Sequence, residues 1–96
     1  MEPAPFFRFR LFVAGDTVNS AQALRNLTNL CIAHLPERHH IEVVDVFIEP
    51  LRALAEGILM TPAMVKLSPQ PVRKIVGTLS NEQILLHALE IEDMVP

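Results

Sequence analysis

The sequence predicts one α/β domain over residues 1–96, with a mixed four-stranded sheet and the order strand, helix, strand, helix, strand, strand, helix. Two segments carry this prediction. Residues 9–20 form a strand-like run that enters a glycine turn and a helix start, and residues 60–77 contain Thr61-Pro62 followed by two strand-like runs. Half of the 96 residues are apolar, which is enough for a single core, and we expect residues 1–6 to be flexible.

The first half of the chain predicts a strand, a helix and a second strand parallel to the first. Residues 7–13 alternate between apolar and polar side chains, as a strand with one well-buried face does. Thr17 or Asn19 is placed to cap a helix that ends at Pro36. Residues 41–47 are almost continuously apolar and β-branched, which predicts a central strand covered on both faces.

The second half predicts a short helix, two strands and a final helix. Residues 51–56 are strong helix formers that follow a proline. Residues 63–67 and 72–76 are short apolar runs separated by a proline-rich turn, which favours two strands. A capping box that begins at Ser80 predicts a helix over residues 81–91.

Composition and charge argue against several classes of function. The formal net charge of −3 gives no electrostatic footprint for nucleic acid. No apolar run reaches the roughly 18–20 residues of a membrane span, and the N-terminal residues do not resemble a secretory signal. We therefore expect a cytoplasmic protein. Cys31 is the only cysteine, which leaves no intramolecular disulfide or multi-cysteine zinc site and favours a buried helix residue.

Candidate chemical sites are outweighed by structural explanations. Gly15 lies before a helix start, where an anion can bind, but no Gly-x-Gly pattern or nearby lysine accompanies it. The histidines within residues 34–40 lie near Glu37 and Glu42, but a metal site needs three or four convergent ligands, and the helix dipole already favours a histidine at a helix C-terminus. Ser20 and Asp45 would need a histidine and a nucleophile elbow to act as a hydrolytic triad. The sequence therefore predicts no catalytic residue, no metal and no cofactor.

The order of elements and the position of Thr61-Pro62 resemble the thioredoxin superfamily. In that superfamily a cis-proline faces the start of the first helix, and the expectation for Thr61-Pro62 is the same. Where thioredoxins carry Cys-x-x-Cys, residues 17–20 read TVNS. The redox chemistry is absent, which indicates a binding protein. The enzyme alternative is a glutathione-using protein in which Ser20 or Thr17 stabilises the thiol.

Four motifs extend the resemblance to a particular family. Residues 11–20, LFVAGDTVNS, are similar to the family's LYVAGNTPNS, and residues 43–46, VVDV, to its VIDV. Residues 60–66, MTPAMVK, correspond to ATPTLxK, and residues 69–80, PQPVRKIVGTLS, to PxPVRKIIGDLS. The chain is thereby identified as a member of the circadian clock protein KaiB family, with a resemblance that covers about residues 10–90.

The resemblance implies a non-enzymatic regulator that binds the ring of a KaiC-like RecA-family ATPase and modulates its phosphorylation and ATPase cycle. A histidine kinase or a KaiA-like protein is a further implied partner. KaiB proteins are known to be metamorphic: a thioredoxin-like state binds partners, and a state with a rearranged C-terminal half forms tetramers. Self-association as a dimer or tetramer is therefore also implied.

The resemblance and the charge pattern point to the same docking residues. The basic residues that help the family meet its partner are retained as Lys66, Arg73 and Lys74, and no acidic residue lies between Glu56 and Glu82. Structural or switch roles are assigned to the following residues: Gly15, Asn19, Ser20, Asp45, Thr61, Pro62 and Ala88.

Departures from the family pattern indicate a divergent paralogue. Glu42 stands where the family usually has lysine, and Val18 where it has proline. Ala88 stands where many relatives have glycine, which favours a helix over residues 81–91 and thus the thioredoxin-like state. A stress-response adaptor and the sensor domain of a KaiC-responsive histidine kinase are the remaining alternatives.

Overall fold

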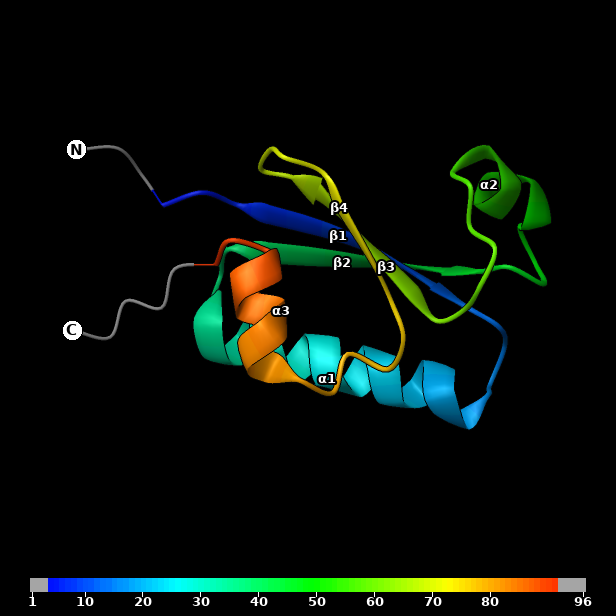
Figure 1. Ribbon diagram of the computed structural model, residues 1–96, viewed down its shortest axis with the longest axis horizontal. Coiled ribbons are helices and arrows are strands. Elements are labelled where there is room, and N and C mark those ends of the chain that lie inside the picture. Colours follow the sequence, from blue (N-terminus) through cyan, green and yellow to red (C-terminus); the bar gives the residue numbers. More distant parts are fainter. Residues whose placement is uncertain (1–3, 92–96) are drawn as a thin grey trace.

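The computed structural model describes residues 4–91, and its elements follow the predicted order (Figure 1). The elements are β1 (Phe7–Val13), α1 (Val18–His34), β2 (His39–Asp45), α2 (Pro50–Ala55), β3 (Ala63–Ser68), β4 (Arg73–Val76) and α3 (Glu82–Ala88). The predicted helix over residues 81–91 is thus present, with regular turns over a shorter stretch. Within the described residues, no helix is long and apolar enough to cross a membrane.

The four strands form one mixed sheet in the order β2-β1-β3-β4. Strand β1 pairs in parallel with β2 and antiparallel with β3, and β4 pairs antiparallel with β3. The expectation that residues 41–47 form the central strand is wrong, because β2 lies at the edge of the sheet and Val43 is 45% exposed. A β-branched run reports strand propensity, and it does not report position in the sheet.

Strand β1 lies inside the sheet, as β3 does, and helices cover both of its faces. Phe9 and Phe12 point to opposite faces, and both are fully buried. Helices α1 and α3 cover the Phe9 face, where the larger core lies, and the short helix α2 covers part of the Phe12 face (Figure 1). One face of the sheet is therefore covered far more completely than the other.

Two side chains define the starts of the helices beside the sheet. Thr17 Oγ1 accepts a hydrogen bond from the amide of Ser20 at 3.3 Å, which confirms Thr17 as a cap of α1. The cap of α3 is Asn81, whose Oδ1 accepts from the amide of Ile84 at 3.1 Å, and the prediction of Ser80 was wrong by one residue. The Ser80 hydroxyl instead bonds the Thr78 hydroxyl at 2.8 Å.

The turn into β3 has the predicted backbone form. The Thr61-Pro62 peptide bond is cis, as are Ser68-Pro69 and Gln70-Pro71 in the turn between β3 and β4. Pro62 is buried, and its carbonyl accepts from the amide of Gly77 at 2.9 Å. This bond fixes the relation between the start of β3 and the end of β4.

Candidate partner-binding surface

The groups at the start of α1 are used to hold the strand-to-helix turn. Ser20 is 2% exposed, and its hydroxyl oxygen accepts from the amide of Ala14 at 3.1 Å and from the hydroxyl of Thr17 at 2.8 Å. Asp45 Oδ1 accepts from the amides of Gly15 at 3.2 Å and Phe47 at 2.9 Å. Gly15 has a φ of +58°, a conformation that glycine adopts without strain. The Ser20 hydroxyl oxygen and Asp45 Oδ1 are thus engaged by neighbouring residues.

Asn19 and the histidines take different positions. Asn19 lies exposed in the first turn of α1, next to the cap. His34 Nε2 lies 3.1 Å from Glu82 Oε1, and His39 Nδ1 lies 2.7 Å from the carbonyl oxygen of Leu35. Over residues 4–91 no three acidic, histidine or cysteine side chains come together as metal ligands.

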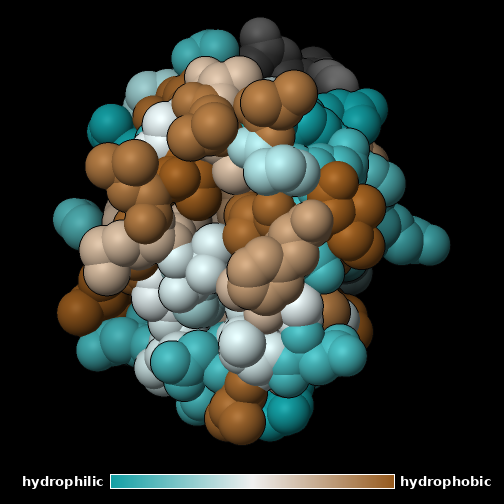
Figure 2. All heavy atoms as spheres, turned by 90° about the vertical axis from the view of Figure 1, so that its right-hand side faces the viewer, coloured by the Kyte–Doolittle hydropathy of each residue, from teal (hydrophilic) through white to brown (hydrophobic). Residues whose placement is uncertain are grey.

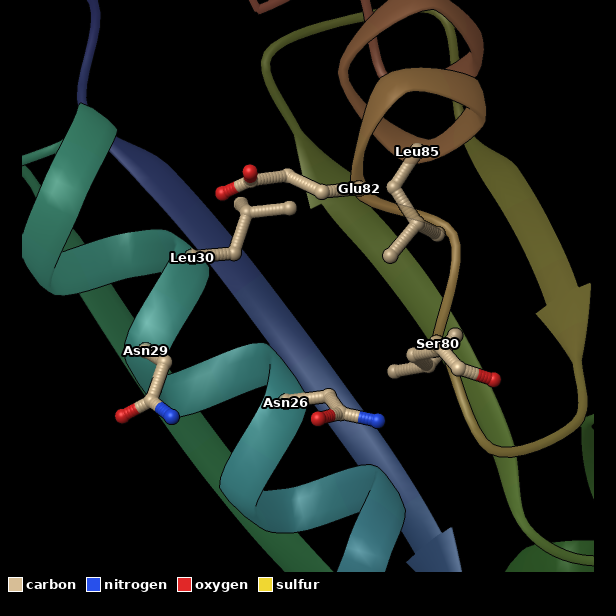
Figure 3. A pocket seen from close by; sticks show the side chains of 7 residues that line it. Asn26, Asn29, Leu30, Ser80, Glu82 and Leu85 are labelled. Atoms are coloured by element: carbon tan, nitrogen blue, oxygen red, sulfur yellow. The ribbon is translucent and has the colours of Figure 1, made fainter.

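A hollow between α1 and α3 is lined by polar and apolar side chains from both helices and from the segment that leads into α3 (Figure 3). It measures about 160 Å³, and Asn26, Leu30, Glu82 and Leu85 lie around it. Asn26 Nδ2 donates to the carbonyl of Thr78 at 2.8 Å, which ties the segment before α3 to α1. This hollow is small, and its polar groups serve the contact between the two helices.

The structure separates the three basic residues that were predicted to form one docking face. Lys66 is only 1% exposed, and its ammonium donates to the carbonyl of Leu89 at 3.1 Å, with Nζ 5.7 Å from the ring centre of Phe7. Burial lowers the pKa of Lys66, because desolvation disfavours the charged ammonium. Lys66 is therefore not on the surface of this fold.

Arg73 and Lys74 are exposed, but they project from opposite faces of β4. Side chains alternate along a strand, so Arg73 lies on the α3 side and Lys74 on the α2 side. Lys74 Nζ donates to the carbonyl of Glu56 at 2.9 Å, just after α2. Arg73 Nη2 lies 4.0 Å from the carboxylate of Glu90, just after α3. These cations complement the negative ends of the two helices.

The most unusual surface of the molecule is apolar and surrounds α2. Its members combine large side chains with high exposure, and we call them the α2-end surface: Phe47 (74%), Ile48 (76%), Leu51 (78%), Leu54 (66%), Leu59 (89%) and Met60 (66%). Figure 2 views the molecule from this end, where apolar side chains spread over much of the visible face. Large apolar patches of this kind typically mark sites of protein–protein contact.

The sequence contained a signal for this surface that the helix assignment alone did not use. Helix α2 has only six residues and buries one of them, Ala53. Leu51 and Leu54, three positions apart on the helix, project outward. Large leucines around one small buried residue indicate a helix whose apolar side faces a partner.

Charged side chains hold α2 in place where apolar packing is thin. Arg10 donates to Glu42 at 2.7 Å and to Glu56 at 2.8 Å, and Arg52 donates to the second oxygen of Glu42 at 3.0 Å. The hydrogen bond from Arg10, followed by that from Arg52, lowers the pKa of Glu42. This network joins β1 and β2 to the middle and the C-terminal end of α2, and so it positions the α2-end surface.

A protein-family model and several known proteins match nearly all of the described chain. The family model of the KaiB domain matches residues 10–91. The chain belongs to the KaiB family. The circadian clock protein KaiB3 of Synechocystis sp. is 37% identical over 82 residues, which cover 85% of this chain and 80% of that protein. The circadian clock oscillator protein KaiB of Thermosynechococcus vestitus is 39% identical over 82 residues, which cover 85% of this chain and 76% of that protein.

Solved structures confirm the thioredoxin-like fold of this KaiB-family chain. The N-terminal domain of SasA from Synechococcus elongatus superposes with a TM-score of 0.73 at 20% identity, covering 100% of this chain and 94% of that one. Chloroplastic thioredoxin z superposes with a TM-score of 0.75 at 19% identity, covering 90% and 78% of the two chains. At these identities the likeness establishes the fold alone.

Membership of the KaiB family gives the departures at Glu42 and Ala88 a structural context. A lysine at position 42 would place three cations together with Arg10 and Arg52, so in this chain a carboxylate is the residue that fits. Ala88 is part of α3 and half-buried, where alanine stabilises the helix relative to glycine.

Proposed function

We propose that this protein is a non-enzymatic, cytoplasmic regulator that binds a KaiC-like RecA-family ATPase and modulates its phosphorylation and ATPase cycle. The observation that carries the proposal is the α2-end surface on a chain of the KaiB family. Six large apolar side chains with exposures of 66–89% would lose contact with water in a complex. The thioredoxin-like state, in which α3 is a helix, presents this surface ready-formed.

The enzyme alternative finds little support at the start of α1. A glutathione-using protein needs an accessible group there to stabilise the thiol, as Ser20 or Thr17 was considered to do. The Ser20 hydroxyl is buried and accepts from Ala14 and Thr17. Cys31 lies inside the core, where burial raises the pKa of its thiol to about 12, so the reactive thiolate is not formed at neutral pH.

The proposal is tested by binding and by the partner's own activity. Purified chain is mixed with the purified KaiC-like ATPase, with ATP or ADP present, and complex formation is followed by size-exclusion chromatography with light scattering. We expect a defined complex and a changed rate of ATP hydrolysis or autophosphorylation. A chain that neither forms a complex nor changes either rate with either nucleotide would contradict the proposal. A glutathione-conjugation assay in parallel tests the enzyme alternative.

A further inference from the structure

The outer edge of β4 carries backbone groups available for pairing. The amide of Gly77 donates to the carbonyl of Pro62, so residues 62 and 77 form a hydrogen-bonded pair of the β3–β4 ladder. Such pairs alternate in an antiparallel ladder, and the backbone groups of Lys74 and Val76 therefore point away from β3. Among residues 4–91, no hydrogen bond is made to these outward groups. The edge can accept another strand.

The α3 side of this edge is a groove that holds the exposed guanidinium of Arg73. A hollow of about 410 Å³ lies between β4 and α3, lined by Arg73, Ile75, His87, Ala88 and Glu90 together with Lys74. The Arg73 side chain is 50% exposed, and its distance of 4.0 Å from Glu90 makes that ion pair weak. A carboxylate on an added strand would meet the Arg73 guanidinium with little competition.

The α2 side of the same edge carries Lys74, and around Val76 it is apolar and continues into the α2-end surface. A hollow of about 210 Å³ lies beside Val76 and is lined by Leu59, Met60 and Ala63, among others. Val76 itself is 50% exposed. An aliphatic side chain on an added strand would bury part of this area and form cross-strand contacts with Val76.

We propose that the β4 edge binds an extended segment of a partner protein in which acidic and apolar residues alternate. Side chains of a strand point alternately to the two faces of a sheet, so acidic residues of the segment would face Arg73 and His87 while apolar residues face Val76 and Met60. Main-chain hydrogen bonds to Lys74 and Val76 would fix the register. This inference rests on the proposed function and specifies how a partner segment engages the surface next to α2.

The probe is a fluorescein-labelled peptide of about seven residues in which glutamate and valine alternate. Controls are a peptide of the same composition with its glutamates and valines in separate blocks, and an alternating lysine–valine peptide. We expect saturable anisotropy changes with the alternating acidic peptide only, and amide chemical-shift changes at Lys74 and Val76. Equal binding of the blocked peptide, or shifts confined to β2, would overturn the proposal.

Variants separate the backbone contribution from the side-chain contribution. Val76→Pro removes one outward amide while sparing the β3–β4 ladder, and Arg73→Glu reverses the charge of the one arginine that lines the groove. Each should weaken peptide binding about tenfold or more, since one removes a strand hydrogen bond and the other places like charges together. Glu90→Gln should tighten it, because the competing carboxylate is gone. Arg25→Glu, an exposed charge on α1, is the matched control and should leave binding unchanged.

Two further results keep this inference separate from the proposed function. If Val76→Pro folds normally and binds the KaiC-like ATPase as tightly as wild type, the β4 mode is wrong while docking on the ATPase stands. If the wild-type chain binds the peptide at β4 but not the ATPase, the proposed function is wrong while the β4 site stands. Concentration-dependent dimers that disappear in Val76→Pro would identify a second copy of this chain as the occupant and overturn the proposal.

Discussion

The ammonium of Lys66 donates a hydrogen bond to the carbonyl of Leu89 at 3.1 Å, and this bond joins β3 to the residue that ends α3. Lys66 was predicted to meet a partner, yet the fold directs it inward. Its position on the same face as Phe9, beneath the end of α3, makes it a structural residue in this state. The energetic role of a buried lysine differs from that of a docking residue, and mutation distinguishes the two.

We expect Lys66→Ala to destabilise the protein by about 2–4 kcal/mol, because it leaves a cavity and an unpaired Leu89 carbonyl. Lys66→Met should cost only about 1 kcal/mol, since the aliphatic packing remains and the desolvation of a charge is relieved. Urea unfolding of the two variants measures both changes in the free energy of unfolding. A marked loss of ATPase binding by a well-folded Lys66→Met variant would instead support the docking role.

Lys66 also gives wild-type stability a dependence on alkaline pH. Its pKa is lowered in the folded protein, so the unfolded chain binds the proton more tightly. The free energy of unfolding contributed by this group therefore rises as pH increases from the lowered pKa to the ordinary one. Lys66→Met should lack this rise. If the free energy of unfolding changes identically with alkaline pH in wild type and in Lys66→Met, this prediction is wrong.

Glu42 gives the stability of the protein a dependence on acidic pH. Its pKa is lowered by the hydrogen bonds from Arg10 and Arg52, so the network stabilises the fold above the ordinary carboxylate pKa. This stabilisation is lost as pH falls through the lowered pKa. Since the Glu42 side chain is 38% exposed and screened by solvent, we expect Glu42→Gln to cost about 0.5–1 kcal/mol at neutral pH. Thermal unfolding from neutral to acidic pH checks this, with a smaller pH dependence expected for the variant.

Much of the fold follows from local patterns in the sequence. Turn residues, the Thr17 cap and the strand and helix periodicities define the βαβαββα order, which the structure has. The sequence did not reveal which of β1 and β2 lies inside the sheet, because both carry apolar runs. Position in the sheet is decided by the pairing of β1 with β3, a contact between segments about fifty residues apart.

The candidate site was predictable in its chemistry and not in its layout. The acid-free stretch of the sequence contains three cations, Lys66, Arg73 and Lys74. Strand alternation and the cover provided by α3 place them in different environments. Leu51 and Leu54 are a local signal for an apolar helix, but the exposure of the α2-end surface depends on how little of the sheet this six-residue helix covers, which is a tertiary property. Tertiary packing decides both results.

Cys31 should be chemically inert in the native protein. It is fully buried, and its pKa is raised to about 12 by burial, so neither thiolate formation nor reagent access is favoured. We expect a thiol reagent such as DTNB to react slowly with native protein and rapidly in urea, and we expect no reduction of insulin disulfides. Measurable reductase activity of the pure protein would contradict the expected inertness of Cys31.

We propose that Ala88 biases this chain toward the thioredoxin-like state and away from the rearranged state that the resemblance to the KaiB family implies. Ala88→Gly should destabilise α3 by about 0.5–1 kcal/mol, and it should increase the fraction of chains in the rearranged, tetrameric state. Ala33→Gly, an exposed substitution within α1, is the matched control. Size-exclusion chromatography and backbone NMR report both states. If both variants leave the oligomeric state unchanged, Ala88 has no special role in the switch.

The most direct test of the account is the affinity of the KaiC-like ATPase for wild-type chain and for Leu51→Glu, measured by isothermal titration calorimetry. Leu51 is 78% exposed at the centre of the proposed contact, and Ile32, 63% exposed on the outer side of α1, provides the matched control Ile32→Glu. We predict that Leu51→Glu weakens binding by about tenfold or more, while Ile32→Glu binds as wild type does. Equal affinities for wild type and Leu51→Glu, or a loss confined to Ile32→Glu, would contradict docking through the α2-end surface.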